Sequence, residues 1–367
     1  MKILQIGNYP PPMCGWAIQT KLVRDELRRR GHVCEVLKIN ENRQLKAPSY
    51  IDVQGGWDYF SKVVRYAFAG YRLNIHLNGM SKKGYLLALA AVLVGRAVFR
   101  PTLVTFHGGL AQDYFPRPDS AWLRMAFRVL FLLAGNIACD SPEIKQAIVD
   151  CGISPQKVSA IATFSSQYVT FTPALLSADI EAFMAVHHPV FFSYVSFRTE
   201  YRLQVLREGM AKFRKLYPNA GIIWLGFPEK EMPPAHRFVG DWPAEERQSL
   251  LLLGNLAHDE FLTLMTRCFA CLRTPACDGV AASVLEALAL GVPVVASENG
   301  HRPSGVVTYQ EMDAEDLSDK LRFVAEHYDE VKAGTLPDTA DDNVAKMADW
   351  LVRDSRARLS SEVARVR

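Results

Sequence analysis

The sequence predicts an α/β protein made of two doubly wound, Rossmann-like domains, and two observations indicate this fold class. The chain has 367 residues, of which 49% are hydrophobic and 22% charged, which suits two ordinary globular domains. Short apolar runs alternate with helical patterns, as is typical of a parallel sheet covered by helices, and this alternation starts a second time near residue 190. Because such sheets bind ligands beyond the carboxyl ends of their strands, we expect a ligand in a cleft between the domains.

The first domain is expected to cover residues 1–175. Its first helix, about Ala17–Arg30, closes with three arginines, which favour the negative end of the helix dipole, and Gly31 ends it. A later helix, Ala121–Leu133, places two arginines one turn apart beside a wide apolar face, which suits packing on a sheet or contact with lipid. The strands are predicted at Lys2–Ile6, Val33–Ile39, Leu73–Leu77, Leu103–Phe106 and Asn136–Cys139.

The second domain is expected at residues 186–340. It follows a connecting stretch, Thr163–Pro189, with a short helical pattern at Ala178–Val186. The acidic run Asp313–Asp316 fits a helix start better than a metal site, because acidic side chains are favourable there. The strands are predicted at Val190–Val195, Gly221–Leu225, His236–Val239, Cys268–Leu272 and Val292–Ala296.

The last segment, residues 341–367, is expected to carry an amphipathic helix and a polar tail. We expect this segment to pack back toward the first domain. The apolar positions of its helix are Val344, Met347, Trp350 and Leu351.

The two halves of the chain carry opposite net charge. Residues 1–175 hold 21 Lys or Arg against 11 Asp or Glu, and the remainder holds 21 against 28, so the net charges are +10 and −7. A basic first domain favours an anionic surface or acceptor as partner, although solvated faces explain the charges equally well; no nucleic-acid partner is expected. The longest uncharged apolar run, Tyr85–Gly95, is too short for the ~30 Å core of a bilayer, so any membrane contact is expected to be peripheral.

The cysteines favour a reducing, cytoplasmic compartment. There are seven of them, an odd number, and the start Met1–Gly7 has the pattern of a buried strand and not of a cleavable signal. Cys268 and Cys271 have no second ligand pair at zinc spacing, so we interpret them as core thiols and predict no metal site.

The loop after the first strand, Gly7–Gly15, excludes two common nucleotide-binding motifs. It lacks both the GxGxxG spacing of dinucleotide-binding proteins and the Lys-Ser/Thr ending of a P-loop. Three prolines stiffen the loop, and Gly15 lets the backbone approach a ligand just before the first helix. A plain rigid turn is the alternative interpretation.

The most informative stretch is residues 278–297, which predicts a loop, a short helix, a glycine stop and a buried strand. The helix is expected to begin near Ser283, so that the amides of Ser283 and Val284 lie at its positive end and can hold a diphosphate. Asp278 on the loop and Glu286 on the helix then offer carboxylates to the hydroxyls of two sugars. The alternative is a capping box, in which Glu286 turns back to its own helix start.

This stretch resembles the motif of two carboxylates separated by seven residues in the retaining family 4 glycosyltransferases, which have the GT-B fold. The likeness extends over most of the chain, although the signals outside residues 278–297 are individually weak. They are the proline and glycine loop after the first strand, Gly31-His32, Thr105–Gly109, Leu225-Gly226 and Gly254–Phe261.

The resemblance implies transfer of a hexose from a nucleotide diphosphate sugar, with retention of the anomeric configuration and without metal or organic cofactor. Glu286 would bind the ribose hydroxyls and Asp278 the hexose hydroxyls, while Ser283 and Val284 would supply the amide cradle. His107, after a first-domain strand, would lie near the transferred sugar and the acceptor, where its imidazole can donate a hydrogen bond.

The chain departs from the family pattern where an Arg and a Lys usually neutralise the leaving diphosphate. No Lys follows the first strand of the second domain at the expected place; Arg198 is the candidate for the first cation, and Arg202 for the second by a register shift. Asp278 also replaces the more usual glutamate, which shortens its reach by one methylene. Arg302 or His301, after the next strand, is a further candidate to border the cleft, although a solvated loop explains this stretch as well.

Two other functions stay open. One is a GT-B sugar-nucleotide epimerase, which needs no acceptor, and the other is a non-catalytic module that binds nucleotide sugar. The acceptor is expected to be a glycan, a lipid-linked glycan or a small molecule, in polysaccharide or glycoconjugate synthesis.

Overall fold

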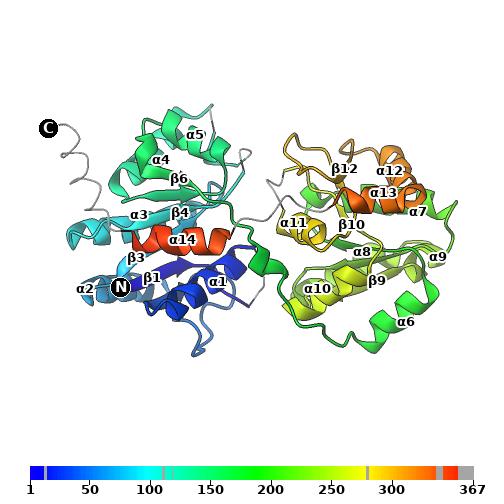
Figure 1. Ribbon diagram of the computed structural model, residues 1–367, viewed down its shortest axis with the longest axis horizontal. Coiled ribbons are helices and arrows are strands. Elements are labelled where there is room, and N and C mark those ends of the chain that lie inside the picture. Colours follow the sequence, from blue (N-terminus) through cyan, green and yellow to red (C-terminus); the bar gives the residue numbers. More distant parts are fainter. Residues whose placement is uncertain (12–14, 110–111, 118, 278–280, 336–341, 354–367) are drawn as a thin grey trace. The chain divides into compact units, whose positions relative to one another are not determined.

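The computed structural model describes residues 1–11, 15–109, 112–117, 119–277, 281–335 and 342–353. The chain divides into two compact units (Figure 1). Unit 1 consists of Met1–Gln167 with the described part of Asp341–Arg367, and unit 2 is Tyr168–Ala340. Each unit contains a six-stranded parallel sheet among its described residues, with helices on both faces, so the predicted doubly wound α/β class is confirmed.

The sheet of unit 1 has the strand order β2-β1-β3-β4-β5-β6. The strands are β1 (Lys2–Gly7), β2 (Val33–Lys38), β3 (Arg72–Leu77), β4 (Leu103–Phe106), β5 (Ile137–Cys139) and β6 (Val158–Ala160). The helices are α1 (Gly15–Arg29), α2 (Gly56–Phe68), α3 (Lys82–Ala97), α4 (Ala121–Leu133), α5 (Pro142–Asp150) and α14 (Asn343–Val352).

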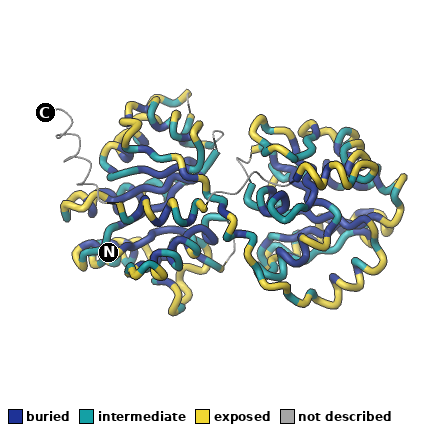
Figure 2. Tube along the Cα trace, viewed as in Figure 1, coloured by how far each residue is buried: buried dark blue, intermediate teal, exposed yellow. Residues whose placement is uncertain are grey.

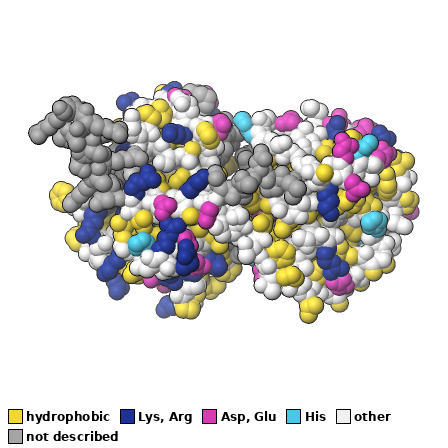
Figure 3. All heavy atoms as spheres, in the orientation of Figure 1, with side chains coloured by type: hydrophobic (Ala, Val, Ile, Leu, Met, Phe, Trp, Pro, Cys, Tyr) yellow, Lys and Arg dark blue, Asp and Glu magenta, His cyan; other side chains and the backbone are white. Residues whose placement is uncertain are grey.

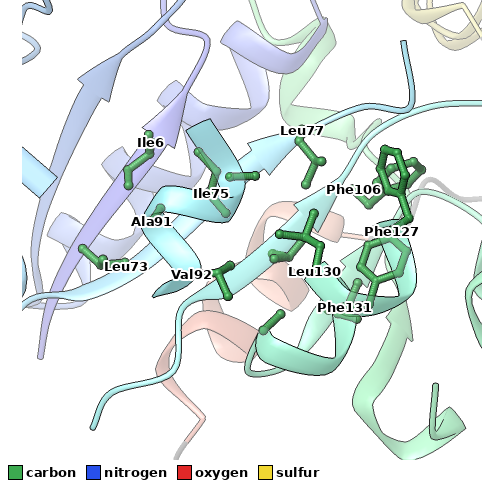
Figure 4. Packing of buried hydrophobic residues seen from close by; sticks show 14 of the residues in the cluster. Ile6, Leu73, Ile75, Leu77, Ala91, Val92, Phe106, Phe127, Leu130 and Phe131 are labelled. Atoms are coloured by element: carbon green, nitrogen blue, oxygen red, sulfur yellow. The ribbon is translucent and has the colours of Figure 1, made fainter. Parts of the chain in front are cut away.

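Two hydrophobic clusters hold the helices on the two faces of this sheet. The larger cluster joins the strands to α2, α3, α4 and α5; in Figure 4, Ile75 and Leu77 of β3 lie among residues such as Val92 of α3 and Leu130 of α4. The smaller cluster joins the other face of the sheet to α1 and α14. The four apolar residues predicted on α14 are all buried: Val344, Met347, Trp350 and Leu351. Figure 2 shows the strands as the buried centre of each unit.

Polar contacts also connect α14 to the rest of unit 1. Arg30 pairs with Asp349 at 2.5 Å, and Arg72 Nη1 donates to the carbonyl oxygens of Leu351 and Arg353. The amphipathic helix predicted near the end of the sequence therefore packs on α1.

The sheet of unit 2 has the strand order β12-β11-β10-β7-β8-β9. The strands are β7 (Val190–Tyr194), β8 (Gly221–Leu225), β9 (Leu250–Gly254), β10 (Ala270–Arg273), β11 (Val294–Ser297) and β12 (Val306–Tyr309). The helices are α6 (Ala178–Val186), α7 (Leu203–Arg214), α8 (Met232–Gly240), α9 (Ala244–Gln248), α10 (His258–Arg267), α11 (Ala282–Ala289), α12 (Ala314–Glu326) and α13 (Tyr328–Ala333).

One predicted strand is wrong. His236–Val239 lies within α8, which begins at Met232 with proline at its first positions. Ala235 and Val239, four residues apart, are the buried residues of this helix, so the apolar spacing is helical and four residues were too few to show it. The predicted helix start at Asp313 is confirmed, because its side chain accepts from the amides of Glu315 and Asp316.

Among the described residues, every helix is too short or too polar to cross a membrane.

Candidate functional site

The helix α11 in unit 2 carries three of the predicted donor-binding residues. It begins at Ala282, one residue before the predicted start, and follows β10, a central strand of the sheet. Ser283 and Val284 therefore lie in its first turn, at the positive end of the helix dipole. The Val284 amide donates to the carbonyl of Ala281 at 3.1 Å, so the helix's own first turn already engages one of the two amides assigned to the diphosphate.

Glu286 is buried against the sheet and does not cap its helix. No side chain among the described residues caps α11 at Ala281, so the capping box formed by Ser283 and Glu286 is wrong. Only 3% of Glu286 is exposed, and burial raises the pKa of its carboxyl to about 8. A buried carboxyl placed beside a helix start, without a capping function, is suited to accept hydrogen bonds from hydroxyls of a ligand.

Asp278, the other carboxylate of the motif, lies outside the described residues. Two arginines hold the segment that precedes this loop. Arg302 donates to the carbonyls of Ser297 and Pro275 at 2.8 and 2.7 Å, and Arg273, which the sequence analysis missed, donates to the carbonyl of Tyr194 at 3.0 Å. Arg302 thus connects β11 to the segment that precedes residue 278.

The two candidate cations for the diphosphate follow β7, which neighbours β10 in the sheet. The Arg198 side chain is 72% exposed, and its Nη1 lies 3.9 Å from Oε1 of Glu200. Arg202 has a left-handed backbone (φ 47°) just before α7, and its Nε donates to Glu311 at 3.0 Å. Arg198 is therefore the more accessible of the two, whereas Arg202 is held in an ion pair.

In unit 1, His107 lies directly after β4 and is fully buried. Its Nε2 is 2.9 Å from Nδ1 of His76, and its Nδ1 is 3.2 Å from Oδ1 of Asp140. The indole of Trp16 stacks on its ring, with the centroids 4.6 Å apart and the planes at 25°. Both ring nitrogens of His107 are therefore engaged within the protein, and a ligand must displace Trp16 to reach the face of the ring that the indole covers.

Gly15 is the first residue of α1 and precedes Trp16. Because Trp16 stacks on His107, the start of α1 lies next to this histidine. Residues 12–14 of this loop lie outside the described residues.

The structure also tests the zinc interpretation. Cys268 and Cys271 are fully buried, and burial raises the pKa of both thiols, that of Cys271 to about 12. Across the described ranges, no three Cys, His, Asp or Glu residues are grouped as a metal site. The two cysteines are core thiols, as predicted.

Comparison with known proteins gives the architecture but not the reaction. No protein-family model and no curated protein matches the sequence. HepE from Anabaena, solved with UDP-glucose, has a TM-score of 0.65 at 15% identity and covers 100% of this chain and 99% of its own. A glycosyltransferase from Rickettsia africae has a TM-score of 0.68 at 13% identity, covering 96% of this chain and 100% of its own. The chain has the GT-B fold.

This GT-B fold is shared by proteins with different reactions. A putative UDP-N-acetylglucosamine 2-epimerase from Listeria monocytogenes has a TM-score of 0.64 at 12% identity and covers 97% of this chain and 98% of its own. The reaction must therefore be inferred from the side chains of the two units.

The predicted site residues fall into two groups. In unit 2, the helix α11 carries Ser283, Val284 and Glu286. Arg198 and Arg202 follow β7, the strand next to β10 in the sheet. Unit 1 brings Gly15 and His107 to the carboxyl edge of its own sheet, next to four residues that the sequence analysis missed: Trp16, His76, Asp140 and Thr163. Asp140 directly follows a predicted strand, so its position at a sheet edge was a signal that could have been used.

Proposed function

We propose that the chain is a retaining glycosyltransferase that moves a hexose from a nucleotide diphosphate sugar to an acceptor hydroxyl. The observation that carries this proposal is the buried carboxyl of Glu286 in the second turn of α11, beside a helix start that favours anions. The structural likeness to HepE, which was solved with UDP-glucose, supports a nucleotide-sugar donor.

In this mechanism, Glu286 accepts hydrogen bonds from the ribose and Asp278 from the hexose. Ser283 and Val284 at the start of α11, with Arg198 and Arg202, stabilise the diphosphate as it gains negative charge. The acceptor oxygen bonds to the anomeric carbon on the face from which the diphosphate leaves, the bond between that carbon and the phosphate oxygen breaks, and the acceptor proton passes to the phosphate. Arginines and a helix dipole perform the electrostatic task here, so we propose neither a metal nor an organic cofactor.

The proposed setting is the cytoplasm, in polysaccharide or glycoconjugate synthesis. Of the described cysteines, Cys34, Cys139, Cys151, Cys268 and Cys271 are buried free thiols, which suits a reducing compartment.

The test that separates this proposal from its rivals is the acceptor dependence of turnover. Nucleotide-sugar donors are incubated with the full chain, with and without a mixture of mono- and oligosaccharide acceptors, and the products are followed by NMR. A transferase releases nucleoside diphosphate only with acceptor, and the product keeps the donor's anomeric configuration. An altered sugar without acceptor would indicate an epimerase, and binding without turnover a non-catalytic module.

A peripheral contact of unit 1 with an anionic membrane face is part of the same proposal when the acceptor is lipid-linked. Helices α3 and α4 are adjacent, because Arg96 Nε donates to the Leu133 carbonyl at 2.6 Å. Between Asp58 and Asp113 the chain carries seven Lys or Arg and no acidic residue, and Figure 3 shows many cationic side chains on unit 1. The exposed large apolar residues on and just after these helices are Leu86, Leu93, Phe99, Trp122, Met125, Val129 and Leu132.

We expect the double substitution Trp122→Ser with Met125→Ser to reduce binding to anionic vesicles at least fivefold, since these side chains are 76% and 51% exposed and would enter the lipid interface. Co-sedimentation at low salt with phosphatidylserine-containing vesicles measures the effect, and exposed Leu175 and Leu216 of unit 2, changed together to Ser, give the matched control. Equal sedimentation of the unmodified chain with neutral and anionic vesicles would contradict the membrane contact.

A further inference from the structure

A cluster of polar side chains lies at the carboxyl ends of three neighbouring strands of unit 1. We call it the Asp140 cluster, and it consists of His76, His107, Asp140, Thr163 and the overlying Trp16. His107 directly follows β4, Asp140 directly follows β5, and Thr163 comes three residues after β6. In a parallel sheet these positions meet at one edge, where ligands of doubly wound folds bind.

Asp140 is the member of this cluster whose charged group reaches the surface. Its Oδ1 accepts from Thr163 Oγ1 at 2.7 Å and from His107 Nδ1 at 3.2 Å, and its Oδ2 accepts from the Gly108 amide at 3.3 Å. Its side chain is 24% exposed, whereas His107 is fully buried. Three donors therefore fix the orientation of a carboxylate that still presents lone pairs to solvent.

His76 fixes the proton positions behind this carboxylate. Burial and the neighbouring His107 ring lower the pKa of His76 well below its ordinary value, so its imidazole is neutral. The Asp140 carboxylate can only accept, so we assign the tautomer in which His107 Nδ1 donates to Asp140 and His76 Nδ1 donates to His107 Nε2. His76 Nε2 then accepts from Asn74 Nδ2 at 3.1 Å, and its 3.3 Å contact with Gln5 Oε1 is not a hydrogen bond in this tautomer. The donors then point in one direction, from Asn74 through both histidines to Asp140.

Gly7 makes room for this arrangement. A Cβ at Gly7 would lie 3.0 Å from the ring of His76, closer than side-chain atoms usually approach, so a side chain at the end of β1 would require the His76 ring to shift. The buried histidine pair is therefore built into the sheet edge.

Trp16 places an aromatic ring on His107, the histidine that contacts the Asp140 carboxylate. Its indole stacks on the ring of His107, which in turn contacts Asp140, and the side chain is only partly buried. A partly exposed indole, with the ring of His107 between it and an oriented carboxylate, suits a sugar ring, because the apolar C–H face of a pyranose packs on an aromatic ring while its hydroxyls donate to a carboxylate.

We propose that Asp140 and Trp16 bind the acceptor, that this acceptor presents an uncharged sugar ring, and that His107 and His76 are positioning residues for the Asp140 carboxylate. This inference rests on the proposed transferase function and names its acceptor class. The negative charge of Asp140 disfavours an anionic group at this point, so an acidic acceptor would have to present a neutral sugar here.

The test uses the full chain and methyl glycosides of glucose, galactose and mannose as probes, with 1,6-hexanediol as a non-sugar alcohol. Saturation-transfer NMR and titration should show binding of at least one glycoside and none of the diol. We expect Asp140→Asn and Trp16→Ala each to weaken that binding at least tenfold, and Trp16→Phe, which keeps an aromatic face, to retain most of it. Asp150→Asn, an exposed change on α5, is the matched control.

Binding of UDP, GDP and ADP is measured on the same variants. This control shows whether each variant is folded, and it distinguishes a failure of the acceptor inference from a failure of the proposed function. Nucleotide binding should be unchanged in every variant, because every residue that we assign to the ribose and the diphosphate lies in unit 2. His76→Gln should raise the acceptor KM or Kd while leaving the donor KM unchanged. If a nucleotide binds but no glycoside does, or if glycoside binding survives both Asp140→Asn and Trp16→Ala, the inference is overturned; if no nucleotide binds, the proposed function itself fails.

Discussion

Replacing Glu286 by glutamine should stabilise the folded protein at pH 8 and, at the same time, weaken nucleotide-sugar binding by roughly 10- to 10²-fold. The two effects have one origin, since the carboxyl is almost completely buried and its pKa is raised to about 8. Glutamine keeps the size of the side chain and cannot ionise. It removes the cost of a buried carboxylate and also the strong acceptor that we assign to the ribose hydroxyls.

The stability that Glu286→Gln gains over the wild type should increase with pH. In the unfolded chain a glutamate has a pKa of about 4.3, so the folded state holds the proton more tightly than the unfolded state. The stability that this difference provides is complete below pH ~4, declines as the pH rises and is lost as the pH passes the folded value of about 8. The gap between the variant and the wild type should therefore widen from pH 4 to 8, up to an upper limit of ~5 kcal/mol.

Thermal unfolding across pH 4–9, with and without nucleotide, measures both effects. Glu326→Gln is the matched control, because it removes one exposed carboxylate from α12 of the same unit. A Glu286→Gln variant that is less stable than the wild type at pH 8, or one that still binds nucleotide as tightly, would refute the assignment.

Replacing Arg198 by alanine should lower kcat by ~10²-fold with little change in Tm. Its side chain is 72% exposed and its nearest acidic partner is 3.9 Å away, so the fold gains little from it. The proposed role is electrostatic, because the leaving diphosphate gains negative charge in the transition state. Arg198→Lys should recover part of the rate, since it restores the charge without the planar guanidinium.

The matched comparison for Arg198 is Arg202. Arg202→Ala breaks the ion pair with Glu311, so its kcat is compared with that of Glu311→Gln. This second variant breaks the same pair but leaves the cation. If Glu311→Gln reproduces the loss caused by Arg202→Ala, Arg202 acts through that pair and not on the diphosphate. A kcat that is unchanged in Arg198→Ala would remove Arg198 from the mechanism.

The alternation of apolar runs was sufficient to predict most of the fold. Leu103–Phe106 and Gly221–Leu225 are strands with the predicted bounds, and Ala121–Leu133 and Ala178–Val186 are the predicted helices. These segments have periods that are clear from the chain itself. The strands β6, β9 and β12, which lie at the edges of the two sheets, were not predicted. β6 and β12 have only three and four residues, whereas β9 is as long as β8 but consists of four leucines and a glycine, without the β-branched or aromatic residues that favour strands.

The candidate site was predicted where its residues are close in sequence. Ser283, Val284 and Glu286 share one short helix, so local spacing shows that they belong together. The Asp140 cluster joins residues 31 and 33 positions apart, from His76 to His107 and from His107 to Asp140. Such contacts depend on the order and register of parallel strands, which a single sequence does not specify.

Binding of a nucleotide diphosphate sugar by unit 2 through Glu286 underlies every role proposed above. The most direct measurement is a thermal-shift and calorimetric screen of UDP, GDP, ADP and their common sugar conjugates on the wild type and on Glu286→Ala, because a ligand that binds only the folded state raises Tm. We expect a rise in Tm with one base, larger for a sugar conjugate that fits, and its loss in Glu286→Ala. Absence of a shift with every nucleotide, or an equal shift in Glu286→Ala, would contradict it.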